Sequence, residues 1–241
     1  AWAGVATQFA WGAMTLLMFR AFYQTSGNAF PMTFPELSNY IWLQQAFLAL
    51  YMSWYFDNEI LLFITSGNIA YELCRPIDIY TMWFLKNMAV RLSRAILRCM
   101  PILVVAVFLP PPYNISLPPS PATGLMFLIS MMLVAFSMLI YVSVFYTISP
   151  TGIRILATSL VEFFTGAIIP LPFFPQSLQS MMYLLPFASV QNTPFQIYNG
   201  YIAGTEVFAG IFLQVIWLFI LLISGKLLMK QAVKKVVVQG G

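Results

Sequence analysis

The 241-residue sequence contains no histidine and few charges, and both shortages narrow the class of protein. Only 7% of its residues are charged, whereas ordinary soluble domains carry about a quarter. Because 61% of the residues are hydrophobic, the chain has too few polar side chains to cover a surface in water. The composition therefore predicts a polytopic membrane protein whose main solvent is lipid.

Several chemical devices are also missing. Histidine is the commonest general base and a frequent metal ligand, and the sequence has none. Its two cysteines, Cys74 and Cys99, form no C-x-x-C pair, so we expect reduced, structural thiols. No G-x-x-x-x-G-K-[ST] phosphate loop occurs, so this chain cannot hydrolyse ATP alone. We expect neither an enzyme nor a metal site, and no cofactor bound by this chain.

Six apolar runs have about the length of roughly 20 residues that crosses a bilayer as a helix. The sequence thus predicts an all-α fold with a single transmembrane domain over residues 1–241. The predicted spans are residues 1–19, 37–56, 92–109, 123–146, 153–169 and 208–228. The first run begins without a charged segment before it, so we interpret it as a span whose preceding residues are missing, not as a signal peptide.

Positive charges predict how these spans are oriented. Ten of the 11 lysine and arginine residues fall on one side of a six-span arrangement, and only Arg20 falls on the other. The ten are Arg75, Lys86, Arg91, Arg94, Arg98, Arg154, Lys226, Lys230, Lys234 and Lys235. Because lysine and arginine concentrate in cytoplasmic loops, both termini are expected in the cytoplasm. The net charge of +4 thus indicates topology rather than nucleic-acid binding.

The cytoplasmic segment 57–91 is the only long stretch of mixed charge. Its pattern predicts a helix interrupted at Ser66-Gly67, a short helix that Asn68 begins and Pro76 ends, and a third helix that starts at Asp78. Two interpretations are equally supported by the spacing. The segment is either a solvated connector whose arginines meet lipid headgroups, or it carries a helix that docks into a groove of a cytoplasmic partner.

Residues 166–200 are apolar but repeatedly broken by proline, most densely in GAIIPLPFFP at 166–175. Proline ends helices, and irregular backbone at membrane depth must be shielded by protein or a water cavity. We expect a re-entrant hairpin of one or two short helices, the alternative being an outer loop with helices lying on the surface. Glu162 inside span five, and Gln44 and Gln45 inside span two, either bond to neighbouring helices or face a pathway.

Taken in order, YIWLQQAFLALYMSWYFDNEI, SGNIAYELCRPIDIY and GAIIPLPFFP resemble the membrane subunit of a type-2 ABC exporter. The likeness covers essentially the whole chain, within the branch often paired with a second, homologous permease. It implies a bacterial plasma-membrane permease that forms a translocation pathway with a second permease, identical or homologous. Two separate ABC ATPase subunits would bind ATP and Mg, and membrane lipids would surround the spans.

The same resemblance assigns roles to residues. ITSGNIAYELCRP at 64–76 matches the coupling helix that sits in the ATPase groove, and the segment 166–195 matches outer helices that close the pathway. The expected coupling residues are Ser66, Gly67, Asn68, Tyr71, Glu72, Arg75, Pro76 and Asp78. The expected pathway or gate residues are Gln44, Gln45, Glu162, Pro170, Pro172, Phe173, Phe174 and Pro175.

Three functional classes follow. The first is the permease half of an ATP-driven exporter for an amphipathic substrate such as a drug, peptide, lipid or glycolipid. The second is an ion-coupled carrier or channel without an ATPase, which predicts several buried charges and an inverted repeat; only Glu162 lies in mid-span and no repeat is evident. The third is a lipid-modifying enzyme, for which the sequence lacks histidine and clustered polar residues.

Overall fold

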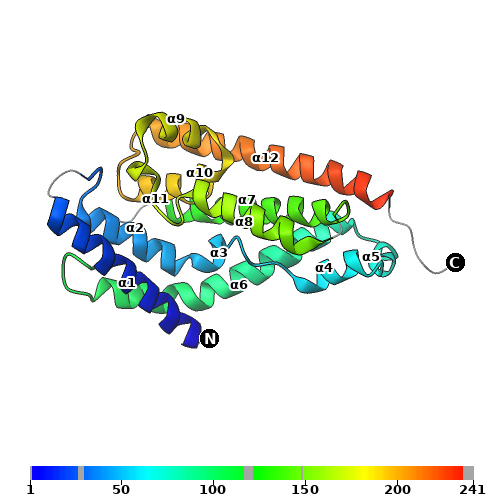
Figure 1. Cartoon of the computed structure of the whole chain (residues 1–241), viewed down its shortest axis with the longest axis horizontal. Coiled ribbons are helices and arrows are strands. Elements are labelled where there is room, and N and C mark those ends of the chain that lie inside the picture. Colours follow the sequence, from blue (N-terminus) through cyan, green and yellow to red (C-terminus); the bar gives the residue numbers. More distant parts are fainter. Residues whose placement is uncertain (1, 27–29, 117–121, 148, 236–241) are drawn as a thin grey trace.

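The computed structural model describes residues 2–26, 30–116, 122–147 and 149–235, with the side chains of Ser26 and residues 122–130 left out. Across these ranges every regular element is a helix. The long helices run roughly along the long axis of the molecule, with α1 inclined to the others (Figure 1). Their bounds are α1 Trp2–Ser26, α2 Phe34–Ala46, α6 Ile79–Val107, α7 Ala122–Val144, α8 Pro150–Thr165 and α12 Thr205–Val233.

Each of these six helices overlaps one of the predicted spans. In the part of the chain that the structure describes, α12 is the one helix both long and apolar enough to cross a membrane by itself. Met131–Val144 of α7 forms a shorter apolar stretch.

The second predicted span is not a single helix, which corrects the expectation for residues 37–56. Phe47 separates α2 from the one-turn helix α3, Leu48–Tyr51, and the following residues are not helical. No proline or glycine marks this break. After the break, the buried guanidinium of Arg91 in α6 donates hydrogen bonds to the backbone carbonyls of Leu50 and Met52.

The third predicted span is the second half of a longer helix. The 29-residue α6 starts at Ile79, where the side chain of Asp78 accepts a hydrogen bond from the backbone N–H of Thr81 at 3.0 Å. Before it come α4, Asn58–Thr65, and α5, Ile69–Leu73. These two short helices lie at the end of the bundle where α12 also finishes (Figure 1).

Between α8 and α12 the chain forms one 3-10 turn and three short helices, one more helix than the sequence predicted. They are η1 Leu171–Phe173, α9 Gln176–Leu184, α10 Pro186–Val190 and α11 Asn192–Tyr198. Helix α8 ends at Gly166, whose φ of 82° is a left-handed conformation that glycine adopts without strain. No continuous helix therefore passes through residues 170–175.

The segment α10–α11 lies in the interior of the bundle. Within residues 186–198 all positions are buried except Phe187 and Ile197, which are half-buried. Helix α10 packs against α7, α8 and α12. The ring of Phe195 meets the rings of Tyr40 and Tyr51 edge-on, at centroid distances of 4.9 and 5.6 Å. The apolar, proline-bounded segment is thus buried between the long helices and is not a wet surface loop.

Candidate functional site

The turn between α4 and α5 is built by three residues that the sequence marked as a helix break. Ser66 ends α4, and its hydroxyl donates to the carbonyl of Leu62 at 2.6 Å. Gly67 follows with φ 75°, and no atom lies within 4 Å of the place where a Cβ would project. Asn68 then precedes α5 as its N-cap residue, without a side-chain cap bond. This turn therefore lies open at the end of the bundle.

Helix α5 has one face directed outward and one directed into the chain. Tyr71 is 75% exposed, whereas Ile69 is 1% exposed. Glu72 is also buried, at 5%, so it does not present its carboxylate to a partner as the sequence had suggested. The outward surface continues through Leu73, Cys74, Arg75, Pro76, Ile77 and Asp78, all of them exposed.

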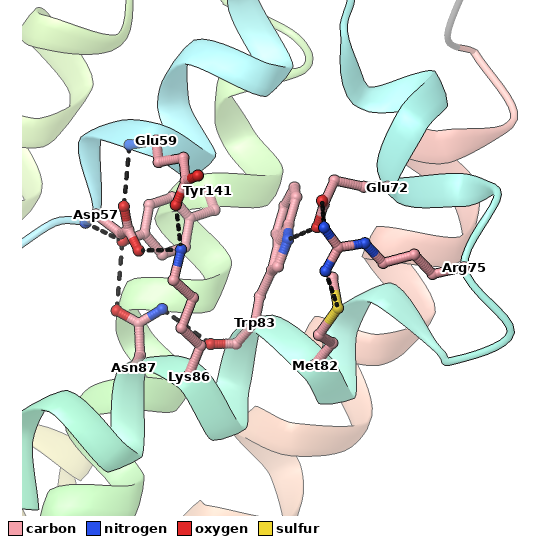
Figure 2. Close-up of polar contacts among 9 residues, drawn as sticks. All are labelled: Asp57, Glu59, Glu72, Arg75, Met82, Trp83, Lys86, Asn87 and Tyr141. Atoms are coloured by element: carbon pink, nitrogen blue, oxygen red, sulfur yellow. Dashed lines mark hydrogen bonds and ion pairs between the residues drawn. The ribbon is translucent and has the colours of Figure 1, made fainter.

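Glu72 instead anchors α5 to α6. Its carboxylate accepts a hydrogen bond from the indole N–H of Trp83 at 3.3 Å and forms an ion pair with Arg75 at 3.0 Å. Figure 2 shows the Arg75 guanidinium between this carboxylate and the sulfur of Met82, to which it is 3.7 Å away. Because Trp83 is almost fully buried, the bond fixes α5 against a rigid part of the core.

A second polar cluster anchors the start of α4 to α6 (Figure 2). The ammonium of Lys86 pairs with Asp57 at 2.9 Å and with Glu59, and the backbone N–H of Asp57 donates to the hydroxyl of Tyr141 at 2.6 Å. Burial by itself would lower the pKa of Lys86, but the bonds to Glu59 and Asp57 raise it, so the residue stays charged. The Tyr141 hydroxyl in turn donates to Asn87 at 3.4 Å. Both short helices are therefore tied to α6.

Asp78 stands where α5 turns into α6. Its carboxylate accepts bonds from the N–H and hydroxyl of Thr81 and lies 3.7 Å from the ammonium of Lys226 in α12. Burial alone would raise the pKa of Asp78, but the Thr81 bonds and the charge of Lys226 lower it below its usual value. The carboxylate thus remains ionised and joins α12 to the turn.

Arg91 supports the same end of the molecule from inside, which the sequence did not indicate. Its side chain is fully buried and donates to the carbonyl of Met52 at 2.7 Å, to that of Tyr55 at 3.3 Å and to the hydroxyl of Ser137 at 3.2 Å. The guanidinium therefore lies at the carboxyl end of α3, where helical carbonyls lack partners. It joins α3, α6 and α7 just before α4 begins.

A groove of about 580 Å³ opens between α1, α2 and the segment that follows α8. We call it the α1–α2 groove. Gln44, Gln45 and Pro170, three of the predicted pathway residues, line it. The same wall contains Gln8, whose buried amide oxygen has no hydrogen-bond partner, and Arg98 from α6. The sequence had not singled out Gln8, because one glutamine in an apolar run carries no spacing signal.

Glu162 lies away from the groove lining. Its carboxylate is half-buried and accepts a hydrogen bond from the hydroxyl of Ser53 at 2.8 Å. Gln44 donates to the carbonyl of Ala167 at 2.6 Å, and Tyr40 donates to that of Gly166 at 3.3 Å. These bonds hold the end of α8 against α2 and α3.

The predicted gate prolines shape a compact turn around η1. Pro170 is buried, Pro172 is half-buried and Pro175 is exposed. The Gln179 amide donates to the carbonyls of Pro172 at 2.9 Å and Phe174 at 2.6 Å and so closes the turn from within.

Two phenylalanines fasten this turn to neighbouring helices. Phe173 contacts the ring of Phe19 in α1 at 5.6 Å, and Phe174 contacts that of Phe163 in α8 at 5.4 Å. Together with Pro170, they bring the turn after α8 to the α1–α2 groove. The predicted coupling residues lie at the α4–α5 end. Of the predicted gate residues, Gln44, Gln45 and Pro170 share the α1–α2 groove, whereas Glu162 lies apart from it.

Among the residues that the structure describes, no group of three or more histidine, cysteine, aspartate or glutamate side chains is arranged to hold a metal ion. An all-helical bundle with a buried, broken segment and an exposed, braced end is compatible with the membrane protein that the composition predicts.

Comparison with protein families agrees with a membrane protein and identifies its family. A family model described as ABC-2 family transporter protein matches residues 9–240, so the chain belongs to the ABC-2 transporter family as a membrane component. No curated protein and no solved structure is significantly similar to it. Members of this family are polytopic permeases without an ATPase domain, they generally act with ATPase subunits, and they typically bind no cofactor.

Proposed function

We propose that this chain is the permease subunit of an ATP-driven exporter of amphipathic molecules: a drug, peptide, lipid or glycolipid. It spans a bacterial plasma membrane six times with both termini in the cytoplasm. It works with a second permease, identical or homologous, and with two ATPase subunits that bind ATP and Mg. The observation that carries this proposal is the exposed, internally braced α4–α5 end in a member of the ABC-2 family.

The proposed ATPase contact is the outward face of residues 64–76. Tyr71 projects from α5 with no packing role of its own, while Ile69 and Glu72 hold the helix from beneath. A helix that docks into a partner transmits force only if its base is rigid. The Glu72–Trp83 bond and the Lys86 ion pairs supply this rigidity and direct displacement of α5 into α6. Ser66, Gly67, Asn68, Arg75 and Pro76 form the rest of the contact surface.

The proposed substrate pathway includes the α1–α2 groove. Gln44, Gln45 and Pro170 line it, together with the indole side chains of Trp11 and Trp54. A mixture of amides, indoles and apolar side chains suits an amphipathic molecule, which needs apolar contact and a few hydrogen bonds. The turn at Pro172 to Pro175 borders the groove and would act as its outer gate, with Phe173 and Phe174 as hinge contacts.

The ion-coupled alternative has weaker support. It needs charged side chains that line a path through the bundle, and Glu162 is the acid in the middle of a predicted span. That carboxylate is occupied by the hydroxyl of Ser53 and does not line the α1–α2 groove. Its position favours a structural role in joining α8 to the residues after α3.

Copurification tests the proposal. A tagged copy of this chain, expressed from its native locus and extracted in mild detergent, should carry an ATP-binding subunit in about equal molar amount. The test variant is the same chain with Ser66, Asn68 and Tyr71 replaced by alanine. All three residues are exposed, so their replacement leaves the core intact. Intact membrane insertion with loss of the ATPase supports the proposal. A chain that transports substrate without any ATP-binding subunit contradicts it.

A further inference from the structure

A second groove of about 720 Å³ lies at the end of the molecule where α12 finishes. Helix α12 forms one wall, and the turn from α5 into α6 forms the other. We call it the lysine groove, because Lys226, Lys230 and Lys234 line it. The sequence analysis gave Asp78 a coupling role but assigned no ligand to this groove.

The lysines form a regular stripe. They are spaced four residues apart, so their side chains project from the same face of α12. One carboxylate, that of Asp78, faces them and lies 3.7 Å from Lys226. Within the described ranges, Lys230 and Lys234 have no ion pair. Three ammonium groups against one carboxylate leave the groove with an excess of positive charge.

The groove combines cationic and apolar side chains, the two kinds of contact that a phospholipid needs. Ile223 precedes the lysines and Leu227 lies between Lys226 and Lys230; these two apolar side chains also line the groove and are 57% and 58% exposed. From Ile223 to Lys234 a helix rises roughly 16 Å, enough for a phosphate headgroup and the upper part of an acyl chain. An apolar molecule would leave the lysines unpaired, and a small anion would leave the apolar part exposed.

The apolar part of the groove is continuous with a membrane-facing surface. Phe219 and Ile220, one turn before Ile223, are also exposed and belong to the helix that meets the criterion for crossing a membrane. A soluble protein partner would reach the lysines but would have no reason to follow this apolar surface toward the bilayer. A lipid meets both conditions, because basic pockets between helices on the cytoplasmic side attract anionic headgroups.

We propose that the lysine groove binds an anionic phospholipid, with its phosphate between Lys230 and Lys234 and an acyl chain along Ile223 and Leu227. Leu73 and Ile77 close the opposite wall, so an occupied groove braces the turn between α5 and α6. The binding site stands on its own geometry. An effect of this lipid on ATPase activity rests on the proposed function.

Lipid retention tests the site directly. The full permease, with any subunits that accompany it, is exchanged into nanodiscs that contain phosphatidylglycerol and phosphatidylcholine, released from them, and its bound lipids are quantified by native mass spectrometry. Phosphatidylglycerol should be retained in preference to phosphatidylcholine. The double variant Lys230→Gln/Lys234→Gln should lower its retention about thirtyfold, because both lysines of the groove would pair with the same phosphate. Excess inorganic phosphate should not displace it.

The chain offers a matched control. Lys235 adjoins Lys234 but lies 4.9 Å from the ring centroid of Tyr146, outside the groove lining. Lys235→Gln should change retention less than about twofold, a value we take as the limit of the measurement. Equal losses in both variants would mean general surface attraction and overturn the proposal, as would unchanged retention in the double variant. Loss of the ATPase with lipid retention unchanged would identify a protein occupant and also overturn it.

The two proposals fail in different ways. If no ATP-binding subunit accompanies the chain but phosphatidylglycerol retention depends on Lys230 and Lys234, the lipid site holds and the exporter assignment fails. If the ATPase binds normally and the lysine variants retain lipid, the exporter assignment holds and the lipid site fails.

Discussion

Tyr71→Ala is the substitution that tests the proposed docking face most sharply. The Tyr71 side chain is 75% exposed on a five-residue helix, so its removal deletes very little packing inside the chain. Thermal unfolding of the isolated permease in detergent should therefore change by less than about 0.5 kcal/mol, as for most surface substitutions. A larger effect of this substitution on the assembled transporter must therefore come from a lost contact with a partner.

The size of that effect follows from the exposed area. An aromatic side chain can bury on the order of 150 Å², and at about 25 cal/mol per Å² this corresponds to roughly 3 kcal/mol before the cost of desolvating its hydroxyl. We take about 2 kcal/mol as the net contribution to ATPase binding, typical of an aromatic anchor at an interface. The variant should then bind the ATPase subunit about thirtyfold more weakly.

The assay is titration of purified ATPase subunit onto immobilised permease, with substrate-stimulated ATP hydrolysis measured in parallel. Phe208→Ala is the matched control, because Phe208 is 72% exposed but lies in the first turn of α12, at the opposite end from α5. An ATPase affinity within about twofold of the parent protein for Tyr71→Ala would refute the docking face. A comparable loss in Phe208→Ala would show that the effect is not specific to α5.

Three further substitutions test the internal supports, each by thermal unfolding in detergent. Glu72→Ala removes the acceptor of the buried Trp83 N–H and should lower stability by about 1–3 kcal/mol. Glu72→Gln keeps that acceptor and loses only the ion pair with half-exposed Arg75, so its cost should be less than about 1 kcal/mol. Arg91→Met leaves the carbonyls of Leu50 and Met52 without their donor and should lower stability by about 3 kcal/mol. The control Arg94→Met loses only a stacking contact with Tyr55 and should lower stability by less than about 1 kcal/mol. Equal effects of the two variants would contradict the role of Arg91. Gly225→Ala places a Cβ 2.6 Å from the Tyr80 hydroxyl and should lower stability by about 1–3 kcal/mol. In the control Gly152→Ala the new Cβ meets no atom within 4 Å, so the variant should be as stable as the parent protein or slightly more stable. An unchanged stability of Gly225→Ala would show that α12 and α6 are not closely packed at this position.

Local features of the fold could be predicted because they depend on neighbouring residues. The apolar runs indicate helices, and Asn68, Pro76 and Asp78 mark helix ends through caps and restricted backbone. The predicted end of span five at residue 169 was placed too late, because Gly166 adopts a left-handed conformation that stops α8 at Thr165. These signals are independent of what packs against the segment.

Features that depend on packing could not be predicted. Arg91, Arg94 and Arg98 share spacing and chemistry, yet only Arg91 is fully buried, because Ser137 and the carbonyls after α3 surround it. Glu72 looked like a surface acid because the sequence does not show that Trp83, 11 positions later, returns to the same place.

The site as a whole was foreseeable only in outline. The family likeness identified residues 64–76 and the proline-rich segment as regions of interest, but not which side chains face outward. Tyr71 and Glu72 are adjacent in sequence, yet the Tyr71 side chain is exposed and the Glu72 side chain is buried. Likewise, Gln44 and Gln45 both line the α1–α2 groove, but Gln8 on the facing helix emerges only from the packing of α1 on α2.

The native cysteines allow the central claim to be tested without new substitutions in the docking face. Cys74 is exposed within residues 64–76, and Cys99 is buried, so a thiol-directed photocrosslinker should attach at Cys74 alone. After illumination of native membranes, the account predicts a covalent adduct between this chain and a polypeptide that carries a phosphate-binding loop, with a yield that changes on addition of ATP. Cys74→Ser should abolish it. Efficient labelling of Cys74 with no adduct to an ATP-binding polypeptide would contradict the claim that this segment couples the permease to an ATPase.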